Sequence, residues 1–201
     1  MGRLSEKQLW IGAAVLAALI LGLALALAYI NSDQNDRPVD SSESDSDRFS
    51  REYPRVRGNN RFVYATNDEV ISIFGGGTGV VFLGFPECPW CQAIVEYIDQ
   101  AAADEGIERV YYLNIRQERQ DNTPVYRQLL SYLEPYLEPD DSGELKLLVP
   151  DITAIKDGRI VGRFEMEAAT YAEPINSPAD YWSGQRAQRG LESLRQLMRK
   201  L

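Results

Sequence analysis

The hydrophobic pattern of this chain changes twice along its 201 residues. Residues 9–30 are apolar without a single charged side chain. Residues 31–58 are polar and rich in Ser and Asp, with few large apolar side chains. From residue 59 onward, short apolar runs alternate with stretches of helical periodicity, which is typical of a folded domain. The pattern therefore predicts a membrane segment, a linker and one domain over residues 59–201.

The apolar run at residues 9–30 is long enough to cross a membrane. As a helix with a rise of about 1.5 Å per residue it reaches about 33 Å, slightly more than the hydrocarbon thickness of a bilayer. Basic residues precede it and acidic residues follow it: Arg3, Lys7, Asp33 and Asp36. This charge bias predicts a single-pass anchor, with residues 1–8 in the cytoplasm and the domain outside the cell.

A cleaved signal peptide is the alternative for the same segment. Ala26-Leu27-Ala28 has the spacing of small residues found at cleavage sites. The apolar run is longer than the core of a typical signal peptide, which favours an uncleaved anchor over a secreted product. Either interpretation exports the domain.

The polar stretch at residues 31–58 is predicted to be a disordered spacer, because it offers little apolar surface to offset the entropy of ordering. Its acidic side chains contribute to a formal net charge of −9. A charge of this sign argues against nucleic acid and anionic membrane surfaces as partners.

The domain alternates strand and helix patterns, which indicates an α/β fold with a mixed sheet. Thr66-Asn67-Asp68 and Thr123-Pro124 provide helix starts, and Asp157-Gly158 is a strong hairpin signal. The expected strands are 61–65, 80–85, 109–115, 151–156 and 159–164, and the expected helices follow residues 66, 91 and 123 and occupy the C-terminal stretch around Leu191, Leu194, Leu197, Met198 and Leu201.

Both cysteines of the chain lie in one motif, Cys88-Pro89-Trp90-Cys91, between an apolar strand pattern and a helical pattern. The first cysteine is thus expected at a helix N-terminus, where unpaired N–H groups and the helix dipole favour an anion. A thiolate is the reactive form of cysteine, and such a position lowers the thiol pKa. We expect Cys88 to be the nucleophile and Cys91 the resolving thiol.

Two other uses of a Cys-x-x-Cys pair are open. A zinc site normally takes four Cys or His ligands, and this sequence has no histidine and no third cysteine, so carboxylates would have to complete the site. Two buried structural cysteines are the other alternative, although Pro89 and Trp90 suit an exposed turn. The strand-to-helix context favours redox chemistry, which needs no metal and no other cofactor.

Three segments together resemble the thioredoxin-like family, in particular membrane-anchored or secreted members from Gram-positive bacteria, including bacteriocin-transport accessory proteins. They are the strand and cysteine motif at residues 80–91, Val149-Pro150, and the hairpin at residues 155–162. The resemblance covers residues 61–201 and implies a three-layer sandwich around a mixed central sheet.

The resemblance also implies roles for residues near the cysteines. Pro150 would be a cis proline facing the pair, and the Val149 backbone would bind a substrate peptide together with Pro89 and Trp90. Without the resemblance, Pro150 is an ordinary proline at a strand edge and Trp90 is a partly buried aromatic residue.

Two positions depart from the thioredoxin pattern. Phe82 stands where thioredoxin has a buried aspartate, and Tyr112 stands where it has a lysine, so the proton relay of that family is missing. Glu87 and Asp151 are candidates for proton transfer, although Glu87 has the alternative of a solvated turn residue. Residues 165–187 form an insertion that either docks a substrate or packs its aromatic side chains on the domain.

The expected function is that of an extracytoplasmic thiol–disulfide oxidoreductase, tethered to the membrane and acting on thiols and disulfides of exported proteins. Its redox direction is open, with oxidation or isomerisation favoured over reduction because the domain is exported. The alternative is a non-catalytic module that binds an exported peptide or a membrane partner.

Overall fold

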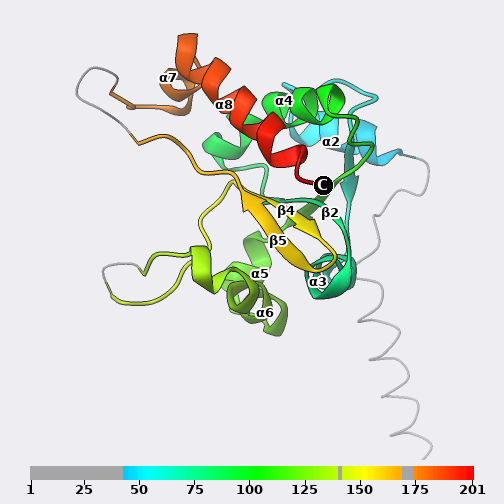
Figure 1. Cartoon of the computed structure of the whole chain (residues 1–201), viewed down its shortest axis with the longest axis vertical. Helices are drawn as coiled ribbons and strands as arrows, with labels where there is room; N and C mark the ends of the chain where they lie inside the picture. Colours follow the sequence, from blue (N-terminus) through cyan, green and yellow to red (C-terminus); the bar gives the residue numbers. More distant parts are fainter. Residues whose placement is uncertain (1–42, 140–141, 169–173) are drawn as a thin grey trace, which may run out of the picture. The chain divides into compact units, whose positions relative to one another are not determined.

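A five-stranded mixed sheet lies at the centre of the computed structural model, which describes residues 43–139, 142–168 and 174–201 (Figure 1). The strand order is β1-β3-β2-β4-β5. Strands β1, β3 and β2 are parallel, whereas β4 is antiparallel to β2 and β5 is antiparallel to β4. The strands are β1 (Phe62–Tyr64), β2 (Gly79–Gly84), β3 (Val110–Asn114), β4 (Asp151–Lys156) and β5 (Arg159–Arg163).

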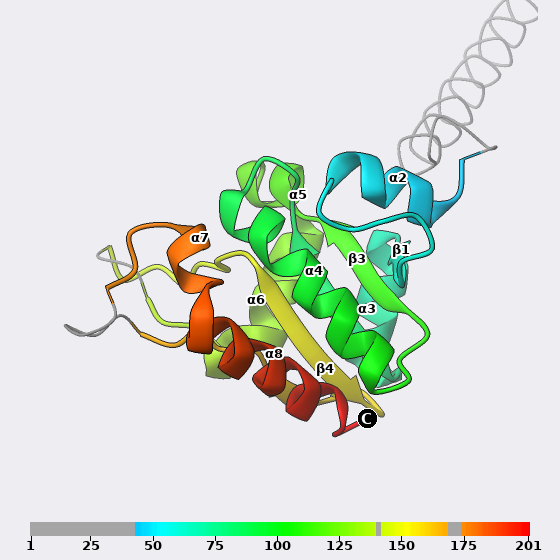
Figure 2. The same ribbon diagram turned by 90° about the horizontal axis from the view of Figure 1, so that it is seen from above.

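Helices cover both faces of this sheet, and Figure 2 shows α4 and α8 side by side on one of them. That face carries α2 (Asp45–Glu52), α4 (Pro89–Asp104) and α8 (Gly184–Met198). The other carries α3 (Asn67–Gly76) and α6 (Pro124–Leu133). Shorter elements are α5 (Arg116–Gln120), the 3-10 helix η1 (Glu134–Tyr136) and α7 (Pro178–Tyr181). The prediction of an α/β fold with a mixed sheet is confirmed.

Local signals in the sequence set several of these boundaries. Thr66 caps α3 by accepting a hydrogen bond from the Glu69 N–H, and the Glu69 side chain bonds back to the Thr66 backbone. Thr123 caps α6 ahead of Pro124 at the first helical position. Asp157-Gly158 joins β4 to β5 with positive φ at both residues, the conformation of a tight hairpin turn.

The prediction of disorder over residues 31–58 is wrong for residues 43–58. Helix α2 forms there, and the Ser44 side chain caps it by accepting from the Asp47 N–H. Phe49 is fully buried, with its ring stacked 3.8 Å from Phe62 and 4.4 Å from Tyr53. Polar residues dominate the composition of the segment, but its few apolar side chains lie on one side and cover the β1 edge of the sheet.

The predicted cytoplasmic residues 1–8, the predicted anchor at 9–30 and the rest of the linker lie outside the described residues. Among the residues that the structure does describe, no helix has both the length and the apolar character needed to cross a bilayer.

Replacing Phe49 by Ala tests the role of α2 in the domain. Removing a buried aromatic ring is expected to lower the free energy of unfolding by about 3–5 kcal/mol, because it removes the packing of α2 on β1. Urea unfolding of the full-length chain measures this change. Arg57→Ala, at an exposed position of the same segment, is the control and is expected to change the value by less than about 0.5 kcal/mol.

Candidate functional site

The two cysteines lie where strand β2 passes into helix α4. Cys88 is the N-cap residue of α4 and Pro89 is the first helical residue. The Cys91 N–H donates a hydrogen bond to Cys88 Sγ over 3.2 Å, so the first turn of the helix is directed at this sulfur. Both residues are free thiols; Cys88 is 7% exposed and Cys91 is fully buried. The expected strand-to-helix position of the motif is confirmed.

Pro150 lies opposite this turn. The Val149–Pro150 peptide bond is cis, and Cys88 Sγ lies 3.9 Å from the Val149 carbonyl oxygen. The structure thus brings Val149 and Pro150 to Cys88, although Val149 lies 61 residues after Cys88 in the chain. Their role in substrate binding stays a prediction.

The surroundings of Cys88 lower its pKa to about 6. A hydrogen bond from the Cys91 thiol is the largest cause, and the backbone N–H groups of Cys91 and Trp90 also stabilise the thiolate. The Arg119 guanidinium acts in the same direction by its charge, whereas partial burial opposes the shift. A large fraction of this thiol is therefore ionised at neutral pH.

The second cysteine has the opposite electrostatics. Burial raises the pKa of Cys91, and the neighbouring Cys88 thiolate raises it further. Gly84 permits the close packing around this sulfur, since a Cβ at Gly84 would lie 3.1 Å from Cys91 Sγ and 2.8 Å from the Phe82 ring. Two adjacent thiols thus differ in ionisation, with the thiolate on the more accessible one.

A buried tyrosine pair lies in the same core cluster as the cysteines. The Tyr53 hydroxyl donates a hydrogen bond to the Tyr112 hydroxyl over 3.1 Å, and burial raises the pKa of both groups. The Phe82 ring packs near both, with its centre 5.4 Å from that of Tyr112 and 6.2 Å from that of Tyr53. Phe82 and Tyr112, the two positions that the sequence comparison with the thioredoxin pattern singled out, are therefore both uncharged.

Gln92 links the loop before the cysteine turn to the C-terminal end of α2. Its side-chain Nε2 donates to the Pro86 carbonyl oxygen and to the Glu52 carbonyl oxygen, each over 2.8 Å. Arg55, which follows α2, and Glu96 of α4 add an ion pair of 2.7 Å. The loop before Cys88 is therefore held partly by residues from the stretch that composition alone marked as a linker.

The two candidates for proton transfer lie in different environments. Glu87 is exposed and forms a 2.6 Å ion pair with Arg116, which agrees with a solvated turn residue. Asp151 is buried and accepts hydrogen bonds from Arg163 and from the Thr153 hydroxyl. Burial raises the Asp151 pKa.

Asp151 and the cysteines are on different sides of the sheet. The bonded Thr153 lies two residues along β4, so both side chains are on the same face as Ile155, which packs with α3 and α6. The cysteines pack in the cluster on the opposite face. The structure does not bring Asp151 together with the cysteine pair.

Trp90 is half-buried, and the insertion at residues 165–187 packs against it. The Tyr181 ring meets Trp90 edge-on at 6.2 Å, and Trp182 stacks on Tyr97 at 4.2 Å. Tyr181 and Trp182 are both buried. Of the two alternatives for the insertion, aromatic packing on the domain is confirmed for the described residues 174–187.

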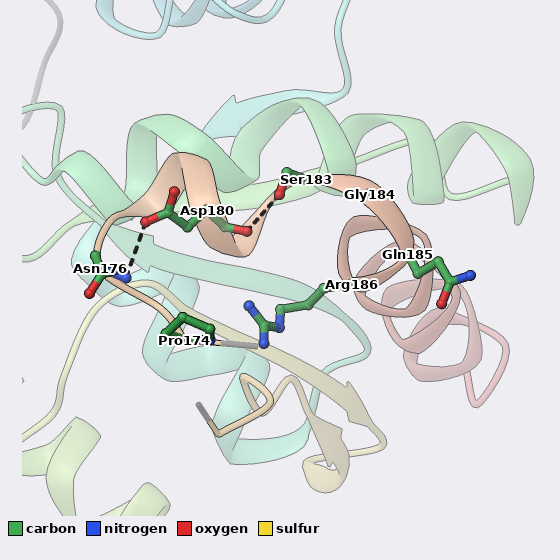
Figure 3. A pocket seen from close by; sticks show the side chains of 7 residues that line it. All are labelled: Pro174, Asn176, Asp180, Ser183, Gly184, Gln185 and Arg186. Carbon is green, nitrogen blue, oxygen red and sulfur yellow. Dashed lines mark hydrogen bonds between the residues drawn. The ribbon is translucent and has the colours of Figure 1, made fainter. Parts of the chain in front are cut away.

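Two open hollows border this insertion. One, of about 450 Å³, lies beside the cysteine turn and is lined by Arg55, Glu87, Pro89, Gln92, Ala93, Ser177, Pro178 and Ala179. The other, of about 390 Å³, lies where α7 meets α8, and Figure 3 shows the Arg186 side chain directed toward Pro174 there. The second hollow is lined by no residue of the cysteine motif.

Sequence patterns did not indicate Arg119 or Tyr53 as residues near the site. Arg119 lies on α5, a short helix without a strong sequence signal, and its guanidinium carbon is 5.0 Å from the centre of the Phe85 ring. Only tertiary packing brings Arg119 and Tyr53 to the turn, so no local pattern could have identified them.

Comparison with known proteins adds no family to this geometry: no family model matches the chain, and no curated protein matches it.

The pH dependence of alkylation tests the electrostatics of Cys88. The rate of reaction with iodoacetamide is expected to rise with pH as the thiolate forms, with a midpoint near the pKa of about 6, and to level off above neutrality. Cys91 is buried and is expected to stay unmodified in the folded chain. A midpoint near about 8.5, the value of free cysteine, would contradict the assignment.

Variants of Cys91 provide the matched control for that titration. Cys91→Ala removes the thiol that hydrogen-bonds to Cys88 and is expected to move the midpoint upward, whereas Cys91→Ser keeps a donor and is expected to move it less.

Gln92→Ala tests the link between the loop before the cysteine turn and the C-terminal end of α2. Loss of its two hydrogen bonds is expected to lower the free energy of unfolding by about 1–3 kcal/mol, because two backbone carbonyls lose their donor. Denaturant unfolding measures this. The exposed Gln128 on α6 is the control position, and an equal effect of Gln128→Ala would show that the link contributes nothing specific.

Proposed function

We propose that this protein is an extracytoplasmic thiol–disulfide oxidoreductase, tethered to the membrane by residues 9–30. One observation carries the proposal: a cysteine thiol with a lowered pKa caps helix α4, one helical turn from a second thiol whose pKa is raised. This asymmetry is what disulfide exchange needs, because one sulfur attacks and the other waits to resolve the product.

We further propose that the domain is thioredoxin-like. Support comes from the mixed sheet with helices on both faces, the cysteine pair at the end of β2, and the cis Val149–Pro150 bond beside Cys88. The sequence resemblance implied the same proline and the same hairpin between β4 and β5.

Oxidation of a substrate would proceed in two exchanges. A substrate thiolate attacks Cys88 Sγ of the oxidised pair; the Cys88–Cys91 bond breaks, and the Cys91 sulfur leaves as a thiolate that takes up a proton. A second substrate thiolate then attacks the substrate sulfur of the mixed disulfide, and Cys88 leaves as a thiolate. The substrate loses two electrons and the cysteine pair gains them; the reverse sequence reduces a substrate disulfide.

The lowered pKa of Cys88 favours the oxidising direction. Interactions that stabilise the thiolate stabilise the reduced form of the pair, and a stable reduced form makes the disulfide a stronger oxidant. An exported domain also works in a compartment where disulfides persist. Pro89, Trp90, Val149 and Pro150 are the residues we assign to substrate contact, and no metal or other cofactor takes part.

A non-catalytic binding module is the second candidate function. It is favoured by the neutral Phe82 and Tyr112 in place of a proton relay and by the small exposure of Cys88. In that case the cysteine pair would serve as a permanent disulfide, and the surface around it would bind an exported peptide or a membrane partner.

Single-cysteine variants separate the two functions. The oxidised full-length chain, purified in a mild detergent, is expected to form disulfides in a reduced, unfolded substrate protein. Cys88→Ser is expected to lower the rate at least about 100-fold, since it removes the sulfur that is attacked. Cys91→Ser, activated at Cys88 with a small disulfide, is expected to accumulate a mixed disulfide with the substrate, visible by mass spectrometry. Equal activity of the parent chain and Cys88→Ser would contradict catalysis and support the binding module.

A further inference from the structure

The half-buried side chain of Arg119 lies beside the cysteine turn without an acidic partner. Its guanidinium carbon is 5.0 Å from the centre of the Phe85 ring, and the Phe85 carbonyl oxygen accepts a hydrogen bond from the Cys88 N–H over 3.1 Å. Among the described residues, no carboxylate lies within ion-pair distance of Arg119. A guanidinium that stacks on an aromatic ring keeps its charge, so this one is available to an anion of another molecule.

The sheet determines where this guanidinium lies. Strands β2 and β3 are parallel, so both end at the same edge of the sheet, and the Ile115 N–H donates to the Gly84 carbonyl oxygen over 3.2 Å just beyond that edge. The cysteine turn follows β2 and the short helix α5, which carries Arg119, follows β3. The two segments are therefore neighbours because their strands pair.

The other charges beside the turn are compensated. Glu87 forms its 2.6 Å ion pair with Arg116, and Arg55 forms its 2.7 Å pair with Glu96. Arg119 thus adds an unbalanced positive charge next to the reacting sulfur, on a chain whose formal net charge is −9. A local charge of this sign attracts anionic groups of a partner and repels cationic ones.

We propose that Arg119 is a specificity-determining residue that favours partner cysteines flanked by acidic side chains. This inference rests on the proposed oxidoreductase function and names its substrate class: exported proteins with Asp or Glu next to the reacting cysteine. The attraction acts through space, so the acidic side chain need not contact the guanidinium, and it accelerates the approach of the partner more than it strengthens the complex.

Two synthetic peptides test this proposal on the oxidised full-length chain in a nonionic detergent. Each contains one reduced cysteine, flanked by Glu in one peptide and by Gln in the other, and the rate at which each thiol attacks the disulfide is measured. The Glu-to-Gln ratio of the parent chain is then divided by that of Arg119→Gln. This double ratio cancels the intrinsic reactivity of the peptides and the general effect of the variant on the cysteine pair.

We expect a double ratio of about three, the factor that corresponds to two unit charges about 6 Å apart in water. In about 1 M salt the double ratio is expected to fall toward one, because screening then limits the attraction to about 3 Å. Arg119→Lys keeps the charge and is expected to keep the preference of the parent chain for the Glu peptide.

Arg109→Gln is the matched control. Arg109 also lies near an aromatic ring, with its guanidinium carbon 6.0 Å from the centre of Tyr111. It directly precedes β3, however, and so lies at the end of the parallel strands opposite the cysteine turn. This variant removes the same charge from the chain and is expected to leave the Glu-to-Gln ratio of the parent unchanged. Equal urea midpoints verify that the variants fold.

The outcomes distinguish this inference from the proposed function. If the parent chain and Arg119→Gln have the same Glu-to-Gln ratio, or if Arg109→Gln lowers it as much, the role of Arg119 is overturned while the oxidoreductase function stands. Should Arg119→Gln not fold, the salt series of the parent decides, and a ratio that does not fall with salt overturns the inference. If the parent chain oxidises neither the peptides nor 2-mercaptoethanol, the proposed function fails and the inference fails with it.

Discussion

The hydrogen bonds that the first turn of α4 and the Cys91 thiol direct at Cys88 Sγ are the interaction on which the site depends. The sulfur stands where the helix leaves N–H groups without internal acceptors, so a negative charge there satisfies the backbone as well as the side chain. Burial of Cys91 raises the pKa of its thiol, so this thiol keeps its proton and donates it in a hydrogen bond to Cys88. One helix end thereby gives two chemically identical side chains opposite ionisation.

Packing around the turn fixes this arrangement in space. Strand β2 is central in the sheet and leads the chain to the N-terminus of α4, and the Val149 carbonyl oxygen, just before β4, lies 3.9 Å from Cys88 Sγ. Gln92 joins the loop before the turn to helix α2, because its side chain donates hydrogen bonds to the carbonyl oxygens of Pro86 and Glu52. Because α2 directly follows the part of the chain that leads to the predicted anchor, the domain begins with an element that contacts its own candidate site.

Helix α2 also shows why composition misled the prediction for residues 43–58. Disorder was expected because the average polarity of the segment is high. Stability, however, depends on where the few apolar side chains go, and Phe49 and Tyr53 enter an aromatic cluster with Phe62 and Tyr112. Those partners come from other parts of the chain, so the contribution of the cluster is invisible in the segment itself.

The sequence by itself determined the elements whose signals are local: the capped helices, the Asp157-Gly158 hairpin, the alternation that makes an α/β fold, and the position of two cysteines at a helix start. These follow from backbone geometry and hydrogen bonding within a few residues. Only the tertiary structure decided that α2 belongs to the domain, that Asp151 faces away from the cysteines, and that Arg119 acts on the charge of Cys88. These features depend on contacts between residues that are far apart in the chain. Such contacts, rather than neighbouring residues in the sequence, set the burial and accessibility of each side chain and the charges around it.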